Sequence, residues 1–241
     1  MSIKIPKAFL YEVGIPAIIL CIGTLIFRFT NVDIAIEELF FVPTVGWVSK
    51  NVRFWKFLHD FGPLPAIITS IFFLLLFIAS FRIRRVATYR KTALFIVLVM
   101  LLGPGLIINS IFKDHWGRPR PRSIHKFEGH LTYLPIWQKG ISGNGHSFPS
   151  GHASMGYFLM TPFFLFRKRA RRRAVGFLTL GIGLGLLIGL GRMIQGGHFA
   201  SDVMWAGGFV YFCGLGLAYA LRLPGYRISE SGGSFGEREL L

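Results

Sequence analysis

The chain has 241 residues, of which 52% are hydrophobic, and its mean hydropathy is +0.53. This composition is too apolar for an ordinary soluble domain and indicates an integral membrane protein. The formal net charge is +16, from 27 basic and 11 acidic residues, so nucleic-acid binding has to be weighed against membrane binding.

Six apolar runs are each long enough to cross a bilayer, which takes about 20 residues of α-helix. They predict an all-α integral membrane protein in which six transmembrane helices form a bundle, as a single domain over residues 1–221. The predicted helices cover residues 9–29, 62–81, 92–112, 148–166, 174–191 and 203–221. The first run is long and is followed by Arg28 instead of a small-residue cleavage site, so we expect it to remain as an anchor.

The basic residues are concentrated in two short loops, at 82–91 and 167–173, which follow the second and fourth runs. Both loops then lie on the same side of the membrane, as the excess of Lys and Arg in cytoplasmic loops predicts. This placement argues against nucleic-acid binding. It also predicts that both termini face the cytoplasm and that the polar residues 222–241 form a flexible cytoplasmic tail.

The segment between the first two runs, residues 31–60, mixes charged side chains with Trp47, Phe54 and Trp55. Amphipathic segments of this kind usually lie at the membrane surface, so we expect one or two helices resting on the outer leaflet. In the third run, Gly103-Pro104-Gly105 predicts a kink or a close contact. In the fifth, Gly181, Gly185 and Gly189 predict close helix packing.

The longest polar segment, Lys113 to Gly151, falls outside the cytoplasm in this topology, yet it carries six Lys and Arg against two acidic residues. Two explanations remain open. The cations are attracted to anionic lipid headgroups, or they converge on a phosphate group.

Four predicted helix ends meet on this outer side, and polar residues gather at all of them. Lys113 ends the third helix, Ser150, Gly151 and His152 begin the fourth, Arg192 ends the fifth, and His198 and Asp202 begin the sixth. Unrelated polar residues would scatter over both membrane faces, so this convergence favours a catalytic site. The simpler alternatives are that Ser150 only caps a helix and that Asp202 only stabilises a helix start.

The residue types suit phosphoryl transfer. His198 lies four residues before Asp202, so the carboxylate can hold one imidazole nitrogen and leave the other to attack phosphorus. His152 can protonate the departing oxygen and then activate water. The predicted phosphate-binding residues are Lys113, Arg120, Ser150, Gly151 and Arg192.

A metal site is the rival explanation for the histidines on this side. Hard cations prefer several carboxylates, and zinc prefers closely spaced His or Cys, whereas this region offers few acids among many cations. We therefore predict neither a metal nor a cofactor. The remaining histidines, with His59, are predicted to be surface or hydrogen-bonding residues.

Three motifs together resemble those of the phosphatidic acid phosphatase type 2 (PAP2) superfamily, whose pocket is shared with vanadium-dependent haloperoxidases. They are Lys113 with Arg120-Pro121, then Pro149-Ser150-Gly151-His152, then Arg192 with His198 and Asp202. The resemblance implies a metal-independent phosphatase in which His198 forms a phosphohistidine, Asp202 orients it and His152 is the acid and base. The sequence departs from the family at Gly191, where the family usually has Ser.

The expected substrate is a phosphorylated membrane lipid, at the periplasmic face of a bacterial inner membrane. Residues 114–121, residues 127–129 and Phe148 are similar to bacterial lipid A 1-phosphatases, which favours lipid A 1-phosphate over undecaprenyl diphosphate or phosphatidylglycerophosphate. A lipid phosphotransferase and a non-catalytic anion-binding or transport protein remain alternatives. Haloperoxidase activity is not expected of so hydrophobic a chain.

Overall fold

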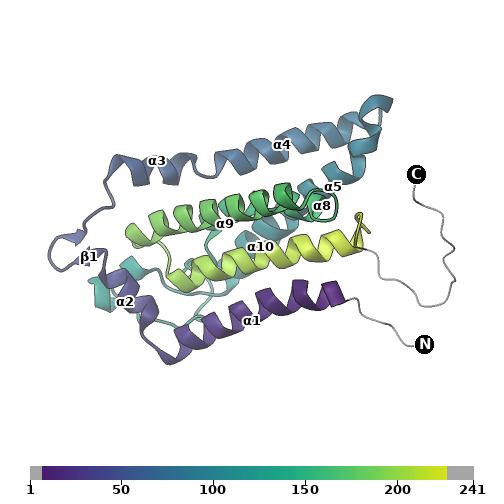
Figure 1. The fold of residues 1–241 in the computed structure, drawn as a ribbon. Helices are drawn as coiled ribbons and strands as arrows, with labels where there is room; N and C mark the ends of the chain where they lie inside the picture. Colours follow the sequence, from purple (N-terminus) through teal and green to yellow (C-terminus); the bar gives the residue numbers. More distant parts are fainter. Residues whose placement is uncertain (1–6, 227–241) are drawn as a thin grey trace.

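Long helices lie side by side in the computed structural model, which describes residues 7–226 (Figure 1). Within this part of the chain, five helices are long and apolar enough to cross a membrane. They cover Leu10–Phe29, Arg53–Ala79, Arg84–His115, Arg171–Ile194 and Ala200–Ala220. The all-α membrane fold is confirmed, but the structure has five such helices where the sequence predicted six.

The difference lies in the predicted fourth helix, which is interrupted. It consists of α7 (Gly151–Phe158) and α8 (Pro162–Phe166), separated by a turn at residues 159–161. Pro162 has no backbone N–H and fits only the start of a helix, so α8 begins anew there. Each piece is too short to span a bilayer by itself.

The first and last two helices are continuous. They are α1 (Lys7–Phe29), α9 (Arg171–Ile194) and α10 (Ala200–Ala220). The second span consists of α3 (Arg53–Phe61) and α4 (Leu64–Ala79), which follow each other across Gly62-Pro63.

The third span begins with a 3-10 turn, η1 (Arg84–Tyr89), and continues as α5 (Arg90–Met100), the π-helix η2 (Leu101–Phe112) and α6 (Lys113–His115). Pro104 lies inside η2, where its missing N–H breaks the α-helical bonding pattern. The side chain of Asn109 donates from Nδ2 to the Pro104 carbonyl at 2.7 Å. The irregularity predicted at Gly103-Pro104-Gly105 is therefore a π-helix, and it fixes a side chain next to the candidate site.

One end of the bundle, called here the site end, is covered by short elements. They are α2 (Val32–Glu38), the antiparallel hairpin of β1 (Phe41–Val42) and β2 (Gly46–Trp47), and the 3-10 turns η3 (Pro121–Ser123) and η4 (His125–Phe127). Trp47, Ile124, Phe127 and Phe199 form a small buried cluster that holds them together. Of the one or two surface helices expected within residues 31–60, α2 is a short separate helix, whereas α3 belongs to the second span.

Glycines bring α7 and α9 into close contact, as the four-residue spacing predicted. A Cβ atom added to Gly185 would lie 2.4 Å from the ring of Tyr157, and one added to Gly181 would lie 2.3 Å from the backbone nitrogen of Met160. The helices can approach this closely only because no side chain lies between them.

The packed part of the chain extends beyond residue 221, where the flexible tail was expected to begin. Leu223 and Tyr226 are buried in the main core cluster. The rest of the predicted tail, residues 227–241, lies outside the described residues.

Candidate active site

His198 is buried, and its orientation is fixed by a backbone carbonyl. Its Nδ1 lies 2.6 Å from the carbonyl oxygen of Ser147. A carbonyl can only accept, so Nδ1 carries the proton and Nε2 carries the lone pair. This is the form of imidazole that acts as a nucleophile.

Asp202 is close to His198 but does not bond it directly, because His198 Nδ1 and Asp202 Oδ2 are 3.8 Å apart. Its Oδ2 instead accepts the Ser147 hydroxyl at 2.6 Å and the Phe199 backbone N–H at 2.8 Å. The carboxylate thus links the loop before α7, which contains Ser147, to the residue that follows His198. Sequence spacing predicted the pairing of His198 with Asp202, and the structure adds Ser147 as the residue that contacts both.

Arg118 links the Asp202 carboxylate to α2, through Asp33. It is fully buried and donates from Nη1 to Asp202 Oδ1 at 2.5 Å and from Nη2 to Asp33 Oδ2 at 2.8 Å. Asp33, on α2, also accepts the backbone N–H of Ser201 at 2.9 Å. Burial by itself lowers the pKa of the Arg118 guanidinium, but Asp202 and Asp33 outweigh it and raise the pKa overall. The first turn of α10 is therefore held by a charged network.

Glu37, one turn after Asp33, is also buried, and no hydrogen-bond partner for its carboxyl oxygens lies among the described residues. Burial, followed by the nearby charges of Asp33 and Asp202, raises its pKa well above 4.5. A neutral Glu37 adds no third negative charge beside Arg118.

Lys113 approaches the start of α7. Its ammonium donates to Asn109 Oδ1 at 3.2 Å, and a Cβ on Gly151 would lie 3.1 Å from Lys113 Nζ. Only glycine lets the ammonium lie against the backbone here. Gly151 and Lys113 thus lie together, as the phosphate-site prediction requires.

Arg192 lies against the loop that carries His198. A Cβ on Gly197 would lie 2.7 Å from Arg192 Nη2, and Arg192 Nη1 donates to Gln195 Oε1 at 2.5 Å. The Nε atoms of Arg192 and Arg120 are buried, with no hydrogen-bond partner within the part of the chain that the structure describes. Burial, followed by the charge of Arg122, lowers the pKa of Arg120. Unpaired buried donors of this kind are costly without an anion.

Ser150 serves as the N-cap of α7, accepting the Ala153 N–H at 3.4 Å, and its own N–H donates to the Asp202 carbonyl at 3.3 Å. The simple capping role considered for it is therefore present. The same backbone bond places the starts of α7 and α10 side by side, so His152 and His198 belong to one site.

His152 lies in the first turn of α7. Burial, followed by the nearby Arg192, His59, His198 and Lys113, lowers its pKa to about 3, and a bound phosphate anion would act in the opposite direction. The His152 ring stacks on the ring of His59, with ring centroids 4.7 Å apart and an angle of 20° between the planes. His59 was expected to be a surface or hydrogen-bonding residue; it does bond Asp60, at 2.8 Å, and its ring also lies against His152. A single histidine on an amphipathic helix gives no local sequence pattern from which this contact follows.

Burial lowers the pKa of His198 to about 4, and the positive charges of Arg192 and Lys113 act in the same direction. The nearby Asp202 carboxylate opposes this shift but does not cancel it. His198 is therefore a neutral imidazole at neutral pH.

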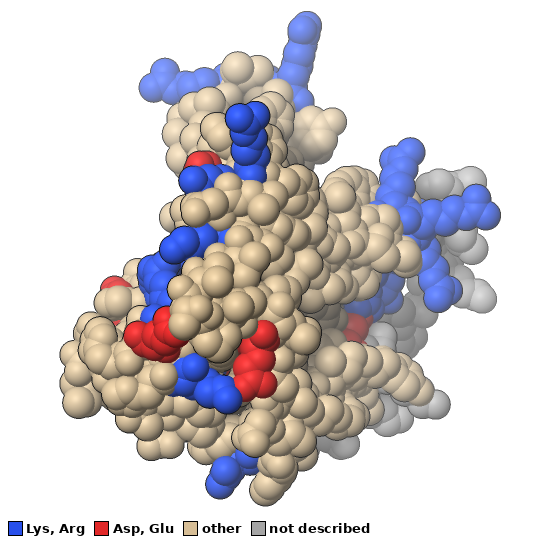
Figure 2. All heavy atoms as spheres, turned by 90° about the vertical axis from the view of Figure 1, so that its left-hand side faces the viewer, with Lys and Arg blue, Asp and Glu red and all other residues tan. Residues whose placement is uncertain are grey.

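The site end presents basic side chains at several places on its surface, with acidic side chains between them (Figure 2). Among the described residues, no group of three or more His, Cys, Asp or Glu side chains is arranged to hold a metal ion. The charge available to bind an anion comes from lysine and arginine side chains.

The chain is similar to several known proteins. The family model of the PAP2 superfamily matches residues 92–226. A lipid A 4'-phosphatase of Francisella tularensis subsp. novicida is 38% identical over 192 residues, which are 76% of this chain and 83% of that protein. A lipid A 4'-phosphatase of Rhizobium leguminosarum is 34% identical over 119 residues, 48% of this chain and 50% of that protein.

A phosphatidylglycerophosphatase B of Bacillus subtilis is 26% identical over 131 residues, 50% of this chain and 54% of that protein. No solved structure gives a significant match to the chain. The matched region of the family model includes all the predicted site residues.

Proposed function

Since the chain belongs to the PAP2 superfamily, we propose that it removes a phosphate group from lipid A by metal-independent catalysis, with His198 as the nucleophile. The broader class, a phosphoric ester hydrolase acting on membrane lipids, follows from the family and its named relatives. The observation that carries the proposal is a neutral imidazole beside buried arginine donors that have no partner among the described residues.

The cations supply the electrostatic part of catalysis. A transferring phosphoryl group spreads charge over its three equatorial oxygens, and preorganised positive charge stabilises that state. Lys113, Arg120 and Arg192 would bind these oxygens, together with the backbone at Ser150 and Gly151. Because these cations neutralise the phosphate charge, the residues need no metal ion for that task.

The covalent step starts at Nε2 of His198, which forms a bond to phosphorus while the bond from phosphorus to the lipid oxygen breaks. His152, whose protonated form the bound phosphate anion stabilises, gives its proton to that leaving oxygen. In the second step His152 takes a proton from water, the water oxygen attacks phosphorus, and the bond to His198 breaks to release inorganic phosphate. Asp202 and Ser147 keep the His198 ring in place through both steps.

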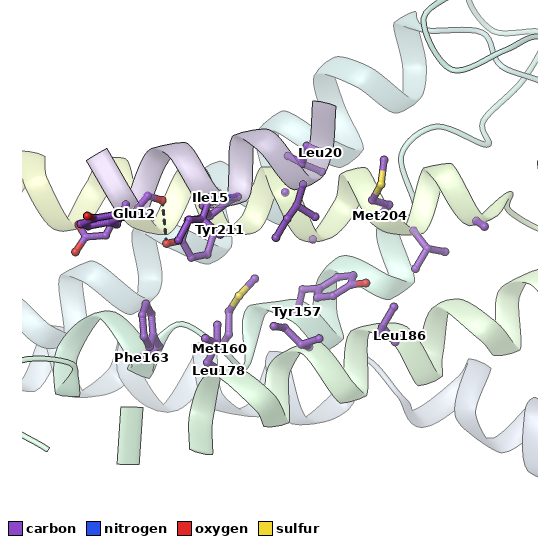
Figure 3. Close-up of a pocket in the computed structure, with 18 of the residues that line it drawn as sticks. Glu12, Ile15, Leu20, Tyr157, Met160, Phe163, Leu178, Leu186, Met204 and Tyr211 are labelled. Carbon is purple, nitrogen blue, oxygen red and sulfur yellow. Dashed lines mark hydrogen bonds between the residues drawn. The ribbon is translucent and has the colours of Figure 1, made fainter. Parts of the chain in front are cut away.

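The relatives named lipid A 4'-phosphatases favour the 4'-phosphate over the 1-phosphate that sequence similarity favoured. A lipid chain has a suitable place within the fold. A cavity of about 630 Å³, almost entirely apolar, lies between α1, α7, α9 and α10 (Figure 3). It extends from Glu12 to Met193 and Ala200, which are close in sequence to Arg192 and His198, so we assign it to an acyl chain of the substrate.

The proposed location is a bacterial inner membrane, with the site end in the periplasm. The basic loops 82–91 and 167–173 lie at the opposite end of the bundle, where positive charge favours the cytoplasm. Labelling of single introduced cysteines at residues 83 and 130 in intact cells would test this orientation, because only the second should react with an impermeant reagent.

Phosphate release from purified lipids by the purified protein tests the function. The panel contains lipid A with only a 4'-phosphate, lipid A with only a 1-phosphate, undecaprenyl diphosphate and phosphatidylglycerophosphate. We expect the 4'-phosphate to be released fastest, without loss of rate in EDTA and with no release by His198→Ala. Loss of activity in EDTA would refute the metal-free mechanism, and radioactive phosphate appearing on an added lipid acceptor would indicate a phosphotransferase.

A further inference from the structure

His59 and His152 form the stacked pair described above, and the contact is made by a helix that is firmly attached to the site. A Cβ on Gly191 would lie 3.2 Å from the ring of Trp55, and one on Gly62 would lie 3.2 Å from the side chain of Ile188. Glycine at position 191, where the PAP2 family usually has serine, thus allows α3 to pack closely on α9. This packing fixes the distance between His59 and α7.

A hydrogen-bond chain joins the same helix to a phosphate-binding residue. The Trp55 carbonyl accepts the side-chain N–H of Gln195 at 3.3 Å, and Gln195 Oε1 accepts from Arg192. Both α3 and the Arg192 guanidinium are therefore held through Gln195. The position of α3 is coupled to the site at two separate points.

The two catalytic histidines are held in different ways. His198 is oriented by a hydrogen bond from Nδ1 to the Ser147 carbonyl. No hydrogen bond to either ring nitrogen of His152 occurs within residues 10–226, so its ring plane is not fixed in this way. Catalytic histidines usually need such a partner for orientation.

The stack with His59 restrains the orientation of the His152 ring in place of a hydrogen bond. His59 Nδ1 lies 2.8 Å from Asp60 Oδ1, which fixes the His59 ring, and the flat face of this ring covers the face of His152. A face-to-face contact restrains the ring plane but leaves both nitrogens of His152 free at its edge. One of them can then face the leaving oxygen and later the attacking water.

On this basis we propose that His59 is a positioning residue, which holds the His152 imidazole by stacking at the angle required for proton transfer. The proposal rests on the proposed function, in which His152 is the acid and base. It assigns α3 a role in the active site, beyond that of a part of the second span.

The test compares three variants by their rates of phosphate release from the preferred lipid. His59→Ala removes the stack and should lower kcat about 3- to 10-fold with little change in KM, which is the range expected for losing an aromatic contact. His59→Phe keeps a flat ring and should restore kcat to within about twofold of the wild-type value. His125→Ala, an exposed histidine of η4, is the matched control and should leave kcat unchanged.

A second measurement does not depend on the substrate. The ring-proton resonances of His152, identified by their loss in His152→Ala, should shift in His59→Ala and shift much less in His59→Phe, because a stacked ring affects its neighbour's resonances. If wild-type protein releases no phosphate from any lipid, the proposed function is wrong. The resonances then still show whether His59 stacks on His152. If His59→Phe is as slow as His59→Ala, or if neither changes kcat or the resonances, positioning by the stack is refuted.

Discussion

At the scale of single residues, the charge state of His198 determines the pH range of activity. Its pKa is lowered from 6.5 to about 4 by burial and by Arg192 and Lys113, so the imidazole remains neutral until the pH falls to about 4. Protonation below that value removes the lone pair. We expect the acid limb of kcat/KM, which reports the free enzyme, to have an apparent pKa near 4. Because a phosphate ester itself has a pKa of about 6, its own titration is measured separately, and an enzyme group near the ordinary value of 6.5 would contradict this environment.

A second residue, Arg118, is expected to control stability. Arg118→Met leaves Asp33 and Asp202 buried without their shared cation, and breaking a buried charge network in this way costs about 3–5 kcal/mol of unfolding free energy. Thermal unfolding in detergent measures the effect. Arg122→Met is the control, since that arginine is exposed and its loss should cost less than about 1 kcal/mol. Equal melting temperatures for the two variants would show that the network contributes little.

At the scale of elements, the contact of α7 with α9 depends on the absence of side chains. Gly185→Ala would place a methyl group 2.4 Å from the Tyr157 ring, so the helices must separate, and we expect a loss of about 1–3 kcal/mol. Gly183→Ala, two residues earlier on the same helix, has no atom within 4 Å of the new methyl group. It should be neutral or stabilising, because alanine favours helix over glycine. Thermal unfolding of both variants separates packing from helix propensity.

Helix content and the position of most spans could be predicted from the sequence, because each depends on a local run of apolar residues. The interruption at residues 159–161 was missed since an apolar run containing Pro162 has the same composition whether or not it breaks. The candidate site residues were predicted from motif spacing, and the structure brings the starts of α7 and α10 together, while the roles of these residues stay predictions. The network around Asp202 was not predicted. Arg118, which bonds Asp202, also bonds Asp33, and these two residues are 85 positions apart with no local pattern that links them. His59 was missed for the same reason.

At the scale of the whole molecule, a lipid phosphatase must hold a charged headgroup at one end of the bundle and an apolar chain along it. The charged groups described above lie at the site end, and the cavity between α1 and α9 runs along the helices (Figure 3). The fold therefore separates the two tasks. In the proposed function, chemistry depends on the helix ends, and chain recognition depends on the helix faces.

This separation predicts a variant that impairs lipid binding alone. Leu186→Trp enlarges a side chain that lines the cavity, so KM for a long-chain lipid should rise several-fold, because the acyl chain loses apolar contact worth about 0.8 kcal/mol for each CH₂ group displaced. Hydrolysis of a short, soluble phosphate ester should be unchanged, because that substrate does not reach the cavity. Leu180→Trp is the control on the same helix, since Leu180 is exposed but does not line the cavity. If Leu186→Trp left the KM for long-chain lipid unaltered, the substrate chain would have to lie on another face of the bundle.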